Sequence, residues 1–231
     1  MMSPQPKTVS PRAVTFETVR THPKVLALVD GANEVMMAMG FTEHGRRHVG
    51  IVAEQTGRIL TALRHPDRDV ELGQIAGYLH DIGNCIARLH HPMHGAAMAF
   101  TLLNEMGLPA HEIAPVIGAI GNHEEVTGGP VSAISAALNI ADKADVHRAR
   151  VQNPVYESFD IHDRVNYAVV DSALEVQRVE AEIVLRIEID TSLASVMEYF
   201  EIFLSRMVMC RKSAEKLGMT FALSVNGTRL E

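Results

Sequence analysis

The sequence has no tryptophan and only two cysteines, Cys85 and Cys210, among its 231 residues. Two cysteines so far apart in the chain provide neither a disulfide framework nor a cysteine zinc site, which favours a reducing compartment. No apolar run is long and uncharged enough to cross a bilayer, and the amino-terminal residues lack the apolar stretch of a secretory signal. We therefore expect a cytoplasmic protein with no membrane partner.

The chain also lacks an excess of positive charge. Its formal net charge is -7, so there is no basic footprint for the backbone of DNA or RNA, and we expect no nucleic-acid partner. Any phosphate group that the protein handles must be neutralised locally. Hydrophobic residues make up 47% of the sequence, enough for a substantial core.

Histidine is abundant instead. The chain contains twelve histidines, and nine of them lie between His44 and His123. A single histidine on the inner face of a helix is more often a hydrogen-bonded core residue than a metal ligand. Nine in one third of the chain indicate a shared chemical role.

Apolar spacing divides the chain into three parts. Prolines and hydroxyl residues in residues 1–14 predict a flexible tail, and residues 15–165 predict a bundle of packed amphipathic helices. In residues 166–231, alternation at 170–176, 183–189 and 221–225 predicts three strands, and four-three spacing at 196–217 predicts a long helix. The fold class is therefore mainly α: a helical bundle followed by a small α+β module of β-β-α-β order.

The apolar stripe of the long carboxyl-terminal helix has two interpretations. It covers its own three-stranded sheet, which is the interpretation we favour, or it meets a second chain and forms a homodimer through the module.

Polar residues that bind metals recur at the ends of the predicted helices. His48 continues a buried stripe, with His44 four positions earlier on the same predicted helix. The stretch "GYLHDIGNC" sets His80 beside Asp81 at a helix end, and the remaining candidates lie at a helix start, in a loop and at the edge of a buried face: His91, His123 and Asp142. Burying such groups without partners costs about 1 to 3 kcal/mol each, and a metal ion removes that cost. Nitrogen and oxygen donors without thiolate suit Fe, Mn, Ni, Zn or Mg.

These motifs resemble the HD-domain superfamily of metal-dependent phosphohydrolases over roughly residues 40 to 150. The resemblance rests on His48 in "HVGIV", on "LHDIG" and on "IADKAD". It implies a metal ion held by His48, His80, Asp81 and Asp142. The segments "HHPMHGA" and "NHEEVTGG" resemble those of two-metal members, which implies that His91 and His123 hold a second ion and that Asp81 bridges the two.

Three departures separate the chain from the cyclic-di-GMP phosphodiesterases of this superfamily. Asn84 follows "HDIG" where that branch usually has lysine, and Asn122 replaces one histidine of a pair. Gly129, Pro130 and Val131 stand in place of the Gly-Tyr-Pro signature. The departures argue against cyclic-di-GMP as the substrate. His44 occupies the place of a third-metal ligand in some relatives, and it also fits a solvent-exposed or capping position.

The resemblance implies a hydrolase that cleaves a phosphomonoester or phosphodiester, of a nucleotide or a small phosphorylated metabolite, with a metal-bound hydroxide. Asp81 is expected to control the shared water, Asp145 to orient a ligand or water, and Lys143, with His147 and Arg150 on one predicted helix face, to hold phosphate. Two alternatives share these ligands: an HD-type di-iron oxygenase, and a non-catalytic metal-stabilised sensor or dimerisation module.

Overall fold

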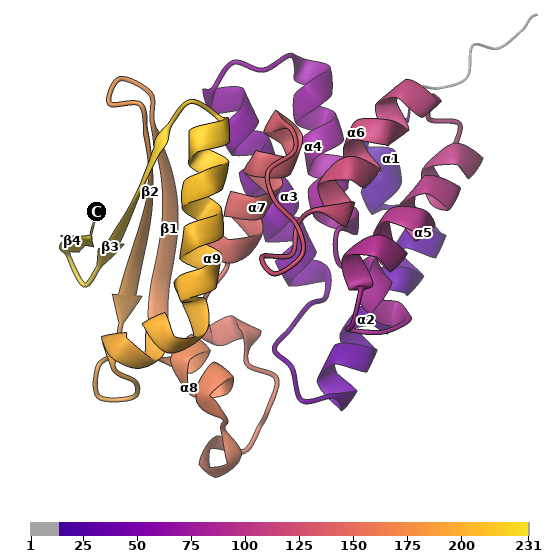
Figure 1. The fold of residues 1–231 in the computed structure, drawn as a ribbon. Helices are drawn as coiled ribbons and strands as arrows, with labels where there is room; N and C mark the ends of the chain where they lie inside the picture. Colours follow the sequence, from indigo (N-terminus) through magenta and orange to yellow (C-terminus); the bar gives the residue numbers. More distant parts are fainter. Residues whose placement is uncertain (1–13, 231) are drawn as a thin grey trace, which may run out of the picture.

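The computed structural model describes residues 14–230, in which a helical bundle is followed by a small sheet (Figure 1). The predicted tail at 1–14 lies outside this range except for Val14, which is buried. The bundle contains α1 (Phe16–Arg20), α2 (Pro23–Ala38), α3 (Arg46–Ala62), α4 (Asp67–Leu79), α5 (His91–Glu105), α6 (Ala110–Gly121) and α7 (Ala133–Ala144), with the short 3-10 helix η1 (Ile82–Cys85) after α4.

The carboxyl-terminal third begins with the short helices η2 (Arg148–Arg150), η3 (Tyr156–Ser158) and α8 (Ile161–Ala168). It continues with β1 (Val169–Gln177), β2 (Glu182–Ile189), α9 (Val196–Lys216), β3 (Thr220–Val225) and β4 (Thr228–Leu230). The strands form one sheet in the order β1-β2-β3-β4, in which β1 pairs antiparallel with β2, β2 parallel with β3, and β3 antiparallel with β4. The parallel pair requires a crossover, which α9 supplies.

The predicted fold class is confirmed, and β4 is an addition to it. The Asn226-Gly227 pair turns the chain between β3 and β4 with φ values of 49° and 75°, the left-handed geometry of a two-residue hairpin. In the sequence, this Asn-Gly pair is the feature that could have predicted β4. Its three residues are too few to show an alternating pattern.

The helix α9 lies between the sheet and the bundle (Figure 1) and packs on both β3 and α7. Buried side chains of the bundle, of α9 and of the sheet belong to one continuous hydrophobic core, to which α9 contributes Tyr199, Phe203 and Cys210. Both cysteines are free, as expected. None of the helices in residues 14–230 is long and apolar enough to span a bilayer.

The contact between α3 and α4 depends on a glycine. A Cβ atom added at Gly77 would lie 2.7 Å from the Cα atom of Ala53 and 2.9 Å from its nitrogen, so only a residue without a side chain fits. This approach places the end of α4 against the middle of α3.

We expect Gly77→Ala to lower the free energy of unfolding by about 1 to 3 kcal/mol, because the added methyl group must push two backbones apart. Gly118→Ala is the matched control: it also lies inside a helix, but an added Cβ there meets nothing within 4 Å. It should raise stability by up to about 1 kcal/mol through better helix propensity. Urea unfolding measures both, and equal effects would contradict the close-approach argument.

Candidate metal centre

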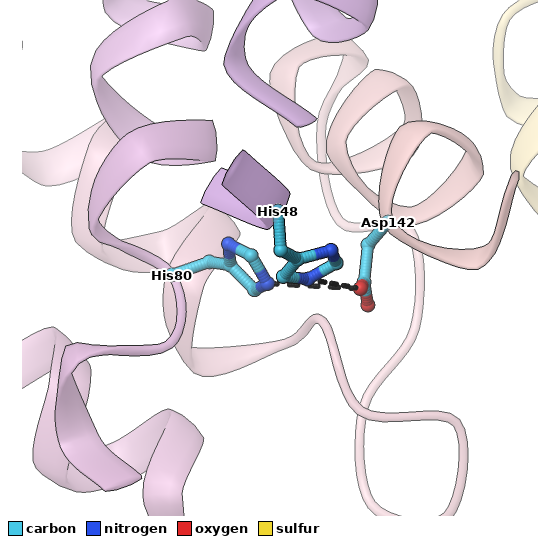
Figure 2. A group of neighbouring side chains, drawn as sticks. All are labelled: His48, His80 and Asp142. Atoms are coloured by element: carbon cyan, nitrogen blue, oxygen red, sulfur yellow. Dashed lines mark ion pairs between the residues drawn. The ribbon is translucent and has the colours of Figure 1, made fainter. Parts of the chain in front are cut away.

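Six side chains predicted as metal ligands converge from different elements. His48 lies on α3, His80 and Asp81 follow α4, and His91 begins α5. His123 follows α6 and Asp142 lies on α7. The side chains of His48, His80 and Asp142 point toward one another (Figure 2). All six lie at the centre of the bundle, and the four histidines and Asp81 are buried.

A second glycine brings the start of α5 to the His80-Asp81 turn. A Cβ atom at Gly83 would lie 2.0 Å from the carbonyl oxygen of His91 and 2.5 Å from the nitrogen of Gly95. Any side chain at position 83 would therefore force α5 away. Without that approach, His91 would not reach the carboxylate of Asp81.

The carboxylate of Asp81 faces two pairs of imidazoles. Its Oδ2 lies 3.3 Å from His80 Nε2 and 3.6 Å from His48 Nε2. Its Oδ1 lies 3.5 Å from His91 Nε2 and 3.8 Å from His123 Nε2. Atoms bound to one ion at about 2.1 Å lie roughly 3 to 3.6 Å from each other, so these separations match ligands around a cation better than hydrogen bonds.

Asp142 completes the first of these pairs. Its Oδ1 lies 3.4 Å from His48 Nε2 and 3.6 Å from His80 Nε2. Donor atoms of two groups lie within 4.8 Å of one another: His48, His80 and Asp142 form one, and His80, Asp81 and His123 form the other. The arrangement could hold metal on either side of Asp81.

Each of the four histidines uses Nδ1 for a bond within the protein. The partners are Asp145 Oδ2 for His48 at 2.8 Å, Gly77 O for His80 at 2.8 Å, Arg88 O for His91 at 3.0 Å and Ile120 O for His123 at 2.6 Å. Because every one of these partners is an acceptor, Nδ1 carries a proton and Nε2 is the nitrogen that faces the centre, with a free lone pair wherever the ring is neutral. This is the tautomer that a metal ligand requires.

Two of these Nε2 atoms have no hydrogen-bond partner among residues 14–230. Nε2 of His48 and Nε2 of His80 are buried without a hydrogen bond. Nε2 of His91 lies 3.0 Å from Nε2 of His123, and two lone pairs at that distance repel unless a positive charge lies beside them. Arg88, with Nη1 3.3 Å from His91 Nε2, supplies part of that charge without a metal. The residues therefore fit divalent metal ions, which nitrogen and carboxylate donors bind.

The buried charges of Asp81 and His80 also fit a site for cations. Burial alone would raise the pKa of Asp81, but the positive charge of His80 beside it holds it well below its usual range. Burial alone would lower the pKa of His80, but Asp81 and Asp142 raise it to about 10, so without metal a proton supplies positive charge here. Burial lowers the pKa of His123, which keeps that imidazole neutral. Metal binding must displace the proton from His80.

The sequence was compared with models of known protein families. Residues 46–150 match the family model of the HD domain. This part of the chain belongs to the HD-domain superfamily. HD domains bind divalent metals and are typical of metal-dependent hydrolases. An uncharacterized protein of Methanocaldococcus jannaschii is 24% identical over 164 residues, which cover 62% of this chain. The match spans 60% of that relative's length, and its name assigns it no activity.

The structure corrects the prediction that His44 and His48 lie on one helix. His44 does not share a helix with His48, because α3 begins at Arg46 after its N-cap Gly45. The backbone of His44 is held instead by Asn33 Oδ1 at 2.9 Å. Its ring still lies 5.5 Å from that of His48, and its Nδ1 contacts Thr42 O at 2.6 Å, so its Nε2 is free to face the cavity that His44 lines.

The helix face predicted for Lys143, His147 and Arg150 is also wrong. The helix α7 ends at Ala144, and His147 begins a separate 3-10 turn. Lys143 is buried and donates to Asp142 Oδ2 at 2.5 Å and to His123 O at 2.8 Å. It holds two elements of the HD centre in place, and its contact with phosphate stays a prediction.

Several residues of the site escaped the sequence analysis. Arg88, Glu124, Glu125 and Arg206 line the cavity beside the proposed ligands. Glu125 Oε2 lies 3.3 Å from Lys143 Nζ, and its Oε1 accepts from Arg206 Nε at 3.3 Å. Arg206 belongs to α9, 81 positions after Glu125, so no local pattern relates it to the HD motifs. The "HEE" stretch that follows His123 was a signal for the two glutamates.

Asp145 lies behind His48 and orients it. Burial alone would raise the pKa of Asp145, but the hydrogen bond from His48 and the charges of Arg150 and Arg47 hold it below its usual range. Arg47 donates to both carboxylate oxygens, at 3.1 and 3.2 Å. An ionised Asp145 fixes the tautomer of His48 and raises its basicity as a ligand.

We expect Asp145→Asn to weaken metal binding by about 10- to 100-fold, because an amide holds the imidazole of His48 less firmly in the tautomer that binds metal. Competition with a fluorescent chelator measures the affinity. Asp171→Asn removes an exposed carboxylate of β1 and serves as the charge control. Circular dichroism shows whether each variant is folded. Equal metal affinity in folded Asp145→Asn and Asp171→Asn would contradict the role of Asp145.

Proposed function

We propose that the chain is a metal-dependent phosphohydrolase that cleaves a phosphomonoester or phosphodiester of a nucleotide or a small phosphorylated metabolite. The observation that carries the proposal is the position of Asp81, each of whose oxygens faces its own pair of imidazoles. His48, His80 and Asp142 would hold one divalent ion, His91 and His123 a second, and Asp81 would bridge them. Fe, Mn, Ni, Zn and Mg all suit these donors.

When bound, such ions neutralise phosphate charge and lower the pKa of a bound water. The chain's own part is to hold the ligand side chains in the orientation that binds metal. Lys143 holds Asp142 by Oδ2, which leaves Oδ1 directed at His48 and His80. Asn84 donates to Asp81 Oδ1 at 2.9 Å and to its backbone carbonyl at 3.0 Å, which fixes the bridging carboxylate.

Positive side chains at the cavity support an anionic substrate. Arg88 lines it with Nη1 3.3 Å from His91 Nε2, and Arg206 lines it with its guanidinium over the ring of Phe203 at 4.7 Å. Phosphoryl transfer depends on positioning and on charge stabilisation. We infer that Arg88 and Arg206 contact phosphate oxygens. These two arginines favour a hydrolase over an oxygenase, and a homodimer through the carboxyl-terminal module remains a separate proposal.

Asp81→Ala should remove both metal ions and abolish phosphate release from p-nitrophenyl phosphate and from a panel of nucleotides, while the bundle stays folded. The reason is that Asp81 is the one proposed ligand shared by both ions. Elemental analysis of protein purified without chelator gives the metal content, and circular dichroism checks the fold. Asp171→Asn is the control. Two metals and near-full activity in Asp81→Ala would sink the proposal.

Arg206→Ala should leave metal content unchanged and lower kcat/KM by about 10- to 100-fold, since a charged hydrogen bond contributes about 1.5 to 3 kcal/mol. Arg211→Ala removes an exposed arginine from the same helix and should change little. Steady-state kinetics with one ester compares the two. Equal kcat/KM values for these variants would show that α9 does not supply a phosphate contact.

A further inference from the structure

The cavity at the metal centre is too small for a whole substrate. It has a volume of about 30 Å³, room for one or two water-sized bodies, and charged or polar side chains form its lining. If the proposed function holds, a phosphate oxygen fits there and the organic part of the ester must lie outside. The surroundings of the cavity therefore decide which esters bind.

A larger groove of about 460 Å³ begins at the rim of this cavity, and Arg88 and Glu124 line both spaces. The rest of the groove is mainly apolar, with Met39 at the end of α2, Leu89 and Pro92 around the start of α5, and Val126 after α6. Its volume is in the range of small-molecule sites. The shared arginine and glutamate make the groove continuous with the metal centre.

Met39, Leu89 and Val126 of the groove are open to solvent, whereas Pro92 is buried. Leu89 is 73% exposed and Val126 is 83% exposed. Single exposed apolar residues are common, but a group of them at one rim indicates a binding surface. A ligand that covers these side chains would gain the free energy of removing their apolar surface from water.

The backbone at the groove is held in a strained form. His90 has a φ of 61°, a left-handed conformation that is unfavourable for a residue with a side chain. The turn lets His91 point into the metal centre while Leu89, two positions earlier, stays exposed at the groove. Strain of this kind persists where it serves a site.

Another hollow is less suited to the organic group. A space of about 290 Å³ is lined by Arg47, Asp145 and Ser172 among others, and it shares no lining residue with the metal cavity. Asp145 separates it from His48. A substrate there could not place phosphate at the metal centre.

We propose that the groove at Leu89 and Val126 is the subsite for the organic part of the substrate, and that it selects phosphate esters carrying an apolar aromatic ring over esters of polyhydroxylated alcohols. Aliphatic walls pack well on a flat ring, and the Met39 thioether adds a favourable sulfur contact. The inference rests on the proposed function, because the ring can be selected only if the phosphate is held at the metals.

Kinetics with 1-naphthyl phosphate and glycerol 2-phosphate test the proposal. Leu89→Asp should lower kcat/KM for 1-naphthyl phosphate about tenfold and leave that for glycerol 2-phosphate within about twofold. Leu89→Ala is the milder second variant, with a smaller loss in the same direction. Val179→Asp is the control, because Val179 is 94% exposed and lies in the turn between β1 and β2, so neither substrate should be affected.

The outcomes separate this inference from the proposed function. Equal losses for both esters, or none, in the folded Leu89 variants would overturn the subsite while leaving the hydrolase intact. If the wild-type protein releases phosphate from no ester, the proposed function fails, and calorimetry with 1-naphthylmethylphosphonate then decides the subsite. Binding that Leu89→Asp weakens and Val179→Asp does not would support the groove, and equal binding by all three proteins would overturn it.

Discussion

The carboxylate of Asp81 is a buried negative charge surrounded by four imidazoles, and the arrangement of the bundle follows from keeping it there. Burying a charge is unfavourable unless an opposite charge lies next to it. The Nε2 atoms of His48 and His80 add to that demand, because neither has a hydrogen-bond partner among residues 14–230. Five helices approach one point, and the apolar core around it excludes the water that would otherwise solvate these groups.

Two close backbone contacts make this convergence possible. Gly77 lets α4 lie directly on α3, and Gly83 lets the start of α5 reach the turn that carries Asp81. The hydrogen bonds of the histidines then set their orientation. His80, His91 and His123 each contact the carbonyl oxygen three residues earlier, so the local turn alone aims them. Local turns therefore orient three of the four histidine ligands, and close helix packing brings these turns together.

The carboxyl-terminal module takes part in the same site. The helix α9 packs on the sheet with one side and on α7 with another, and α7 carries Asp142 and Lys143. Arg206 of α9 reaches Glu125, which in turn contacts Lys143. The sheet thus stabilises the helix that bounds the cavity, a role that the order β-β-α-β did not reveal.

Much of the fold was predictable, because apolar periodicity reports directly which face of a helix or strand is buried. The three longer strands and α9 came from this signal. It failed at element ends, where capping decides: Gly45 starts α3 after His44, and α7 stops at Ala144 before His147. Because of these two boundaries, His44 does not share a helix with His48, and Lys143 does not share a helix with His147.

The amino-acid sequence by itself determined the candidate ligands, since each lies in a short motif. For His80, His91 and His123 the local turn also orients the side chain. Only the tertiary structure decided what surrounds them. His48 is oriented by Asp145, which lies 97 positions away, and Arg206 reaches the cavity from a helix of the other module. The exposed groove at Leu89 likewise joins residues from α2, α5 and the loop after α6. Contacts between segments so distant in the chain depend on how helices pack, and no spacing along the sequence records that packing.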